Sequence, residues 1–203
     1  MLRISYAITV HNEHEELERL LNQLVNNIRS EDEIIVQMDT TATDKVVSVI
    51  NKYNLTKYYY PLNKDFAAFK NNLSKHCTKE FIFQIDADEY PHLHLLESLP
   101  EILEYNYNID VFLTPRINTV EGLTEQHIKQ WGWNINEKGW VNFPDYQWRI
   151  WKNSSKIKWI NKVHERLDGF NEYSALPQME EYCLIHPKSI ERQEKQNQFY
   201  GTI

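Results

Sequence analysis

Three carboxylates follow directly on an apolar segment in the first half of the sequence. Residues 81–85 are aromatic or aliphatic apart from one glutamine, which predicts a buried strand, and Asp86, Asp88 and Glu89 come next. Residues two apart on extended backbone point to the same side, so Asp86 and Asp88 are expected to converge. Close carboxylates repel unless a cation lies between them, and oxygen ligands suit Mg²⁺ or Mn²⁺ with phosphate oxygens in the shell. The segment predicts a divalent metal that binds a diphosphate, although turns also favour Asp at strand ends.

The elements that would position these carboxylates are strands alternating with amphipathic helices. Asn12 is the expected N-cap of the first helix, and Glu15 completes a capping box. Pro91 is expected to end sheet pairing and to open a helix. The predicted strands of this half are residues 2–10, 33–38, 56–60 and 81–85. The alternation predicts a Rossmann-like, mostly parallel sheet with crossover helices.

Open sheets of this kind bind ligands at the carboxyl ends of their strands. The polar residues expected along that edge are His11, Asn12, Glu13, Asp39, Asp86 and Asp88. Asp39 ends the second strand, where an acid can accept hydrogen bonds from a ribose or a base; its alternative role is a turn or helix cap. All 5 glycines lie at or after Gly122, so the first half lacks a glycine-rich phosphate loop. A phosphate must therefore be held in another way.

Size and composition limit the class of protein. The 203 residues predict a single domain, 1–203, with a ligand-binding half at 1–115 and a second half at 116–203. The net charge of -7 and the absence of a Lys/Arg block argue against a nucleic-acid partner. Cys77 and Cys183 have no metal-ligand spacing, which fits a reducing compartment. Without a membrane-spanning apolar run or a signal peptide, the expected location is cytoplasmic, with peripheral membrane attachment left open.

The second half is rich in aromatic residues. A strand is expected over residues 109–115, and residues 147–152 and 157–160 are expected to form an antiparallel pair. All six Trp lie between Trp131 and Trp159, and they could be either core residues or an aromatic surface that stacks on the C–H face of a ring such as a sugar. The best candidates for stacking are those in loop-like sequence, Trp131, Trp133 and Trp140. His186 is expected to end a last short strand, and the polar C-terminal helix is a candidate lid or contact between subunits of a homo-oligomer.

Several segments together resemble family 2 glycosyltransferases, which have the GT-A fold. The matching segments are ITVHNEHEELERLL, EIIVQMDTTATDKV, NKDFAAFKNNL, FIFQIDADEYP and, more loosely, WRIWKN and KWINKVHERL, spread in the family's order over residues 2–167. The resemblance implies an α/β GT-A fold, with a mostly parallel central sheet flanked by helices and a small antiparallel extension on the acceptor side. The sequence departs from the family in its Asp39-Thr-Thr-Ala-Thr-Asp44 loop, which lacks the usual Gly and Ser.

The resemblance also implies roles for individual residues. Asp39 would contact the nucleotide base, Asp86 the sugar side of the nucleotide or the metal, and Asp88 the metal that bridges the diphosphate. Asn71 and Lys70 would lie near the donor, with Lys70 standing where the family usually has Arg. His186 is a further candidate metal ligand, with a core or capping histidine as the alternative.

A carboxylate is needed to deprotonate the acceptor hydroxyl. A general base must lie within hydrogen-bond reach of that proton. The resemblance implies that the VHE segment, residues 163–165, lies close to the donor, so Glu165 is the first candidate and Asp145 the second. As an alternative, Glu165 could pair with Arg149 or Arg166 only to hold a loop.

The expected activity is metal-dependent, inverting transfer of a hexose from a nucleotide-diphosphate sugar, with UDP as the expected nucleotide. The expected cofactor is Mn²⁺ or Mg²⁺, and the acceptor would be a glycan, a lipid-linked molecule or a protein. The second hypothesis is a catalytically inactive relative that binds sugar or nucleotide or serves as a scaffold. The third is a metal-dependent nucleotidyltransferase, which the absence of a glycine-rich basic loop near residues 11–16 disfavours.

Overall fold

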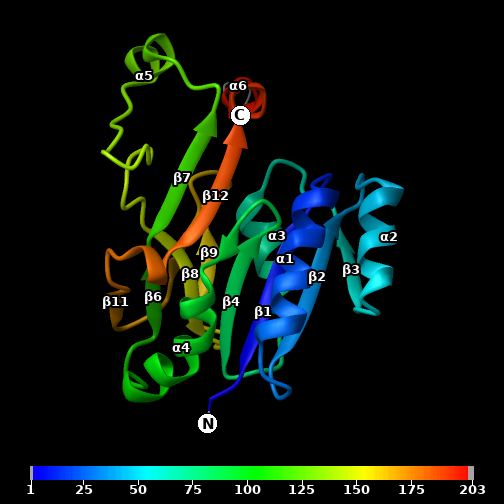
Figure 1. The fold of residues 1–203 in the computed structure, drawn as a ribbon. Coiled ribbons are helices and arrows are strands. Elements are labelled where there is room, and N and C mark those ends of the chain that lie inside the picture. The colour runs from blue at the N-terminus through cyan, green and yellow to red at the C-terminus, as the bar shows by residue number, and fades with distance from the viewer. Residues whose placement is uncertain (1, 201–203) are drawn as a thin grey trace.

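The structure is a computed structural model that describes residues 2–200. Its centre is a seven-stranded sheet in the order β11-β6-β8-β4-β1-β2-β3 (Figure 1). Four of these strands are mutually parallel: β1 (Ile4–Val10), β2 (Glu33–Asp39), β3 (Lys57–Tyr60) and β4 (Phe81–Asp86). The other three come from later in the chain: β6 (Val111–Thr114), β8 (Gln147–Lys152) and β11 (Tyr173–Ala175). The mostly parallel central sheet that the sequence predicted is confirmed.

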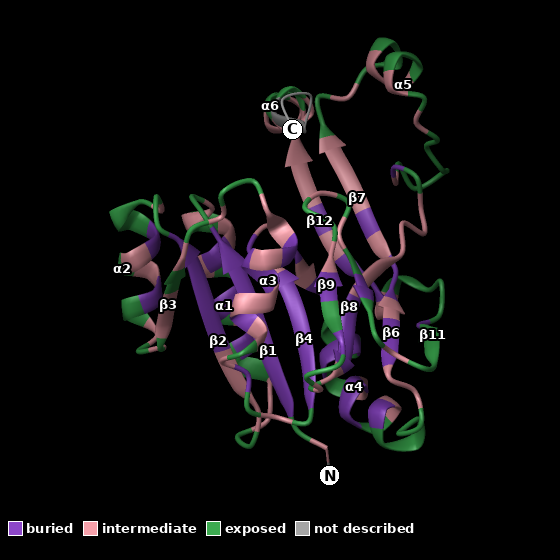
Figure 2. Cartoon of the chain, turned by 180° about the vertical axis from the view of Figure 1, so that it is seen from behind, coloured by how far each residue is buried: buried purple, intermediate pink, exposed green. Residues whose placement is uncertain are grey.

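Helices cover both faces of this sheet. The first face is covered by α1 (His14–Asn27), α2 (Asp44–Lys52) and α4 (Leu93–Tyr105). In α1 the leucines recur at helical spacing, and Leu17, Leu20, Leu21 and Leu24 are all fully buried. The opposite face is covered by α3 (Phe66–Ser74) together with the small antiparallel pair β9 (Lys158–Ile160) and β10 (Arg166–Asp168). Figure 2 shows β1, β2 and β4 buried along most of their length between these layers.

A second, three-stranded sheet extends beyond the carboxyl ends of β1 and β4 (Figure 1). Its strands are β5 (Tyr90–Pro91), β12 (Leu184–Ser189) and β7 (Arg116–Glu121), with β12 in the middle. The remaining elements are α5 (Glu125–Trp131), the 3₁₀ turn η1 (Glu180–Tyr182) and the C-terminal α6 (Ile190–Tyr200). Because β12 runs directly into α6, this sheet brings the start of α6 to the ligand edge of the central sheet.

Two expectations about helix starts are wrong. The N-cap of α1 is Glu13 and not Asn12, and it makes no side-chain capping bond to the helix. Pro91 does not open a helix, since it pairs with Leu184 in β5, and α4 begins at Leu93 with His92 as its cap. Proline is tolerated there because a two-residue edge strand does not need its missing N–H.

The expected pairing of residues 147–152 with 157–160 is also wrong. Strand β8 enters the central sheet between β4 and β6, and β9 pairs with β10. The reason is burial, because Ile150 and Trp151 have 0% and 2% of their surface exposed and need both faces of the sheet covered. His186 lies inside β12 and not at its end, and Pro187 continues the strand opposite Thr119.

Both cysteines are buried, as expected, and burial raises the pKa of each thiol to about 12. None of the helices in residues 2–200 combines the length and the apolar character needed to cross a bilayer.

Candidate active site

The carboxylate of Asp86 lies at the carboxyl end of β4 and is held by protein donors. Its Oδ1 accepts hydrogen bonds from Thr9 Oγ1 at 2.7 Å and Gln84 Nε2 at 2.8 Å. Its Oδ2 accepts from Arg149 Nη2 at 2.6 Å. Burial by itself would raise the pKa of Asp86, but the charges of Arg149 and Lys70 hold it well below its usual value. Asp86 is therefore an ionised carboxylate with a fixed orientation.

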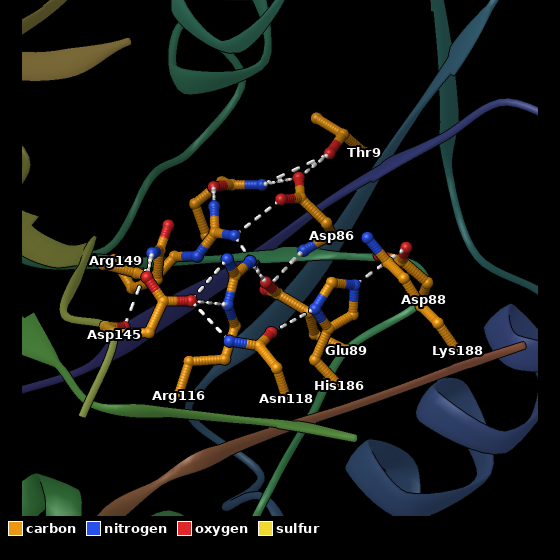
Figure 3. Close-up of polar contacts among 12 residues, drawn as sticks. Thr9, Asp86, Asp88, Glu89, Arg116, Asn118, Asp145, Arg149, His186 and Lys188 are labelled. Carbon is orange, nitrogen blue, oxygen red and sulfur yellow. Dashed lines mark hydrogen bonds and ion pairs between the residues drawn. The ribbon is translucent and has the colours of Figure 1, made fainter. Parts of the chain in front are cut away.

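Arg149 belongs to a row of alternating charges that runs through the protein (Figure 3). We call it the buried charge chain, and its members in order are Asp86, Arg149, Glu89, Arg116 and Asp145. Glu89 has no exposed surface, and its Oε1 accepts from Arg149 at 2.7 Å and from Arg116 at 2.6 Å. Alternation of sign lets buried charges compensate one another, which isolated buried charges cannot do. The chain thus connects Asp86 to Asp145 through side chains alone.

Asp88 points to a different set of partners. Its Oδ2 lies 3.2 Å from His186 Nε2 and 3.1 Å from Arg192 Nη2. Burial would raise the pKa of Asp88, but His186 and then Arg192 hold it far below its usual value. Within residues 2–200, the hydrogen-bond partners of Asp88 therefore differ from those of Asp86, and the predicted convergence of the two carboxylates on one cation stays a prediction.

The orientation of His186 is fixed by a neighbour. Its Nδ1 lies 2.7 Å from Asn118 Oδ1, and the Asn118 amide is itself oriented because its Nδ2 donates to Asp145 Oδ2 at 2.6 Å. An Nδ1–H that donates to Asn118 places the lone pair of Nε2 toward the carboxylate of Asp88. A lone pair facing a carboxylate is unfavourable unless a proton or a cation lies between them.

This pair fits a divalent metal. A metal-bound histidine typically donates its other N–H to a fixed acceptor, and a carboxylate with an imidazole suits Mn²⁺. Within the described residues, no group of three or more His, Cys, Asp or Glu side chains is placed to hold a metal ion. Asp86 therefore does not complete a ligand set with Asp88 and His186. The site offers two protein ligands, which is sufficient for ions that take the rest of their shell from phosphate and water.

Asp39 ends β2 in a constrained loop. Its Oδ1 accepts from the backbone N–H and the hydroxyl of Thr41, at 2.7 and 2.6 Å, and its Oδ2 accepts from the N–H of Leu62 at 2.7 Å. Burial would raise the pKa of Asp39, but these hydrogen bonds lower it. His11 Nε2 lies 3.0 Å from the Thr41 hydroxyl, so the ends of β1 and β2 meet here as predicted for the ligand edge.

The residues after β1 hold their own loop. Glu13 Oε2 accepts from the N–H groups of His11 and Asn12, both at 2.9 Å, while its Oε1 lies 3.3 Å from Arg192 Nη2. The side chain of Asn12 lies against the ring of His11. Glu13 therefore connects the first loop of the sheet to α6.

Lys70 and Glu165 form a buried ion pair on the other side of Asp86. Lys70 Nζ lies 2.6 Å from Glu165 Oε1 and 3.8 Å from Asp86 Oδ1, and only 4% of its surface is exposed. The alternative, in which Glu165 pairs with Arg149 or Arg166, is wrong within residues 2–200: Arg149 binds Asp86 and Glu89, and the ion pair of Glu165 is with Lys70. Asn71 does not point at this pair, since it exchanges two hydrogen bonds with the backbone of Trp159 in β9.

The two candidate bases differ in how their oxygens are used. Asp145 Oδ2 accepts from Arg116 and Asn118, and its Oδ1 accepts from Gln147. Burial would raise the pKa of Asp145, but Arg116 and then Asn118 lower it, which makes the carboxylate a weak base. Glu165 has one oxygen bonded to Lys70 and 17% of its side-chain surface exposed. Geometry therefore favours Glu165 over Asp145.

Five of the six tryptophans fall into two groups by burial, and the sixth, Trp148, is half-buried in β8 against Phe170 and Tyr173. Trp151 and Trp159 are core residues, 2% and 4% exposed, and they pack edge to face. Trp131, Trp133 and Trp140 keep part of their surface exposed, and the rings of Trp131 and Trp133 lie 4.7 Å apart. Contact between these three residues and a sugar stays a prediction.

Sequence reasoning missed three arginines of the site. Arg116 and Arg192 received no role in it, and Arg149, in the WRIWKN segment, was considered only as an alternative partner of Glu165. Glu89 was recognised as part of the acidic segment but not as a buried member of a charge chain. One signal was available in the sequence: Arg149 lies inside the apolar segment WRIW, and a buried arginine is almost always paired with an acid.

Comparison with known proteins was made on both sequence and structure. The family model described as Glycosyl transferase family 2 matches residues 5–169. SPbeta prophage-derived glycosyltransferase SunS of Bacillus subtilis (strain 168) and glycosyltransferase SunS of Bacillus phage SPbeta are each 25% identical over 173 residues, covering 83% of this chain. The chain spans about a third of the length of these relatives, 35% in both cases.

Among solved structures, residues 1–349 of S. aureus TarS superpose with a TM-score of 0.64 at 16% identity, covering 92% of this chain and 60% of that one. The same TarS fragment in complex with UDP-GlcNAc gives a TM-score of 0.63. Mannosyltransferase PcManGT from Pyrobaculum calidifontis, in complex with GDP-Man and Mn²⁺, gives 0.50 at 19% identity, covering 57% of this chain and 36% of that one. With the GT-A fold in common and the family model matching most of its length, this chain belongs to glycosyl transferase family 2.

Proposed function

We propose that this chain carries the catalytic site of a metal-dependent, inverting glycosyltransferase. It would transfer a sugar from a UDP-sugar to the hydroxyl group of an acceptor. The observation that carries the proposal is the contact between Asp88 Oδ2 and His186 Nε2, at 3.2 Å, between residues 98 positions apart in the sequence. Two metal-ligating groups meet there at the ligand edge of a sheet whose family acts on nucleotide sugars.

The proposed donor lies along that edge from β2 to β4. Its base lies near Asp39 and His11, where the Thr41 loop joins the ends of β1 and β2. Its diphosphate would lie near Asp88, two residues after the end of β4. Support for a nucleotide-sugar donor comes from TarS, solved with UDP-GlcNAc, and from PcManGT, solved with GDP-Man and Mn²⁺.

Asp88 and His186 would hold Mn²⁺ or Mg²⁺, with Asn118 orienting the imidazole. The bound ion would supply neutralisation of the charge that develops on the departing diphosphate. Asp86 would act beside it as a fixed carboxylate toward the sugar side of the nucleotide, since Arg149, Thr9 and Gln84 orient it. This assignment gives Asp86 a positioning role in place of metal ligation.

Glu165 is the proposed base that accepts the proton of the acceptor hydroxyl. Lys70 orients it, and part of its side chain remains accessible to an incoming acceptor. The acceptor would be a glycan, a lipid-linked molecule or a protein, approaching over the partly exposed residues Trp131, Trp133 and Trp140. Replacing Glu165 by Gln should lower kcat about 10²- to 10⁴-fold with little change in donor affinity, whereas Asp145→Asn should leave a larger fraction of the turnover.

The decisive experiment measures hydrolysis of UDP-sugars by the purified chain with Mn²⁺, comparing wild type with Asp88→Asn. Asp88→Asn should abolish release of free sugar and Mn²⁺-dependent donor binding. The matched control is Asp168→Asn, which makes the same chemical change on the exposed strand β10 and should behave as wild type. Unchanged turnover in Asp88→Asn would refute the mechanism. Donor binding without hydrolysis or transfer would instead favour a catalytically inactive binding protein.

A further inference from the structure

The C-terminal helix contributes a cation to the proposed metal site. Arg192, in the first turn of α6, places its Nη2 3.1 Å from Asp88 Oδ2 and 3.3 Å from Glu13 Oε1. Its Nη1 lies 2.7 Å from Glu16 Oε1. Glu16 is in the first turn of α1, and Glu13 is the residue before this helix. Arg192 therefore links α6 to the start of α1 and to the loop that follows β4.

The guanidinium contacts the same carboxylate oxygen that faces His186. Asp88 Oδ2 is shared between Arg192 Nη2 and His186 Nε2, at 3.1 and 3.2 Å. A divalent ion coordinated by that oxygen and by Nε2 would lie beside a full positive charge, and two cations at such separations repel strongly. The guanidinium and the metal thus compete for one ligand atom.

We propose that Arg192 is a built-in competitor of the metal ion. It neutralises Asp88 in the absence of metal and must leave this carboxylate before the ion can bind. The inference rests on the proposed function, because it assumes that Asp88 is the metal ligand. It assigns to α6 the regulation of metal affinity.

The structure provides a place for the displaced side chain. Arg192 lines a cavity of about 570 Å³ between the start of α1 and the ends of β7 and β12, and Glu16 lines the same cavity. The guanidinium can therefore retain its contact with Glu16 while it leaves Asp88. Arg192 then keeps its existing ion pair with Glu16, and the metal ion takes over the compensation of Asp88, so no charge is left unpaired.

The helix itself is held by other contacts. Lys188 Nζ in β12 donates to Gln196 Oε1 in α6, and His127 in α5 lies 3.7 Å from Glu194. These contacts do not involve Asp88, so release of Asp88 needs a rotamer change of Arg192 and not departure of α6.

The test is a titration of the nucleotide-free chain with Mn²⁺, followed by electron paramagnetic resonance of the free ion. Arg192→Gln removes the competing charge and should lower the Kd for Mn²⁺ by about tenfold, the factor expected for one charge-assisted hydrogen bond. The matched control is Arg19→Gln, because Arg19 lines the same cavity but stacks on Tyr90, 4.4 Å from the ring centre. It should change the Kd by less than about twofold.

An unchanged or higher Kd in Arg192→Gln would overturn the inference. An equal decrease in Arg19→Gln would also overturn it, because the effect would then come from net charge and not from competition for Asp88. Circular dichroism of each variant checks that the fold is retained.

Asp88→Asn separates this inference from the proposed function. Loss of Mn²⁺ binding in Asp88→Asn together with an unchanged Kd in Arg192→Gln refutes competition alone. If Asp88→Asn binds Mn²⁺ with the affinity of the wild type, Asp88 is not a metal ligand, and both the proposed function and the competition by Arg192 are refuted. The inference is supported when Asp88→Asn loses the ion and Arg192→Gln binds it more tightly.

Discussion

Replacing Arg149 with methionine removes a cation from the middle of the buried charge chain. Arg149 is 2% exposed and donates to Gln84, Asp86 and Glu89 at 2.5, 2.6 and 2.7 Å. Methionine has a similar length and fills the space without charge. The substitution therefore tests the electrostatic role of the side chain with little change in packing.

The contacts of the remaining residues set the magnitude. A hydrogen bond to a charged group contributes about 1.5–3 kcal/mol, and Arg149 makes two such bonds to carboxylates. After the substitution Glu89 keeps Arg116, and Asp86 keeps Thr9 and the more distant Lys70. Breaking one partner from a buried ion pair typically costs about 3–5 kcal/mol. We expect Arg149→Met to lower the free energy of unfolding by this amount.

The assay is urea unfolding at pH 7, followed by tryptophan fluorescence. The matched control is Arg166→Met on the exposed side of β10, which should change the free energy of unfolding by less than about 0.5 kcal/mol. A double-mutant cycle with Glu89→Gln should give a coupling energy of about 1–3 kcal/mol. A loss below about 1 kcal/mol in Arg149→Met, or no coupling to Glu89, would refute the charge chain as a stabilising network.

Three further predictions use other parts of the structure. Acidification from pH 6 to pH 2 should lower the free energy of unfolding. Burial would raise the pKa of Asp86, but Arg149 holds this pKa well below the value of about 4 that the carboxyl has in the unfolded chain. The stabilisation is complete above the unfolded pKa and is lost as pH falls through the folded one, so urea midpoints that do not fall would contradict it. Asp39→Asn should raise the Kd for UDP about tenfold in calorimetry, because it disturbs the carboxylate that fixes the base-side loop; equal affinity would exclude that role. Gly169→Ala should cost about 3 kcal/mol in urea unfolding, since φ is +84° and the added Cβ would lie 2.1 Å from the carbonyl oxygen of Lys156; a neutral result would show that this turn can move.

Local patterns in the sequence were sufficient for the first half of the fold. Leucines at helical spacing predicted α1 because one face of a helix must be buried, and the apolar segment before Asp86 predicted β4 for the same reason. Hydrophobic periodicity is a property of neighbouring residues, so it can be read without knowing the fold. The alternation of these elements then fixed the edge at which Asp39, Asp86 and Asp88 lie.

Pairings in the second half could not be read in this way. Strand β8 is followed by Asn153 and Ser154, a turn signal that suits a hairpin with β9. Only the space between β4 and β6 decided the position of β8. Pro91 and Pro187 carry signals for chain breaks, yet both lie in strands. Pro91 is in the edge strand β5, and Pro187 lies beyond the two residues of β12 that pair with β5, so β12 is paired on one side there.

The sequence by itself determined the mostly parallel sheet, its buried faces and the acidic tip of β4, because periodicity and strand ends are encoded by adjacent residues. Tertiary structure alone decided which charges meet. Arg149 reaches Asp86 across 63 positions, Glu165 reaches Lys70 across 95, and His186 reaches Asp88 across 98. The physical reason is that a long-range contact depends on how whole elements pack, and a charged side chain accepts whichever opposite charge that packing brings within hydrogen-bond distance.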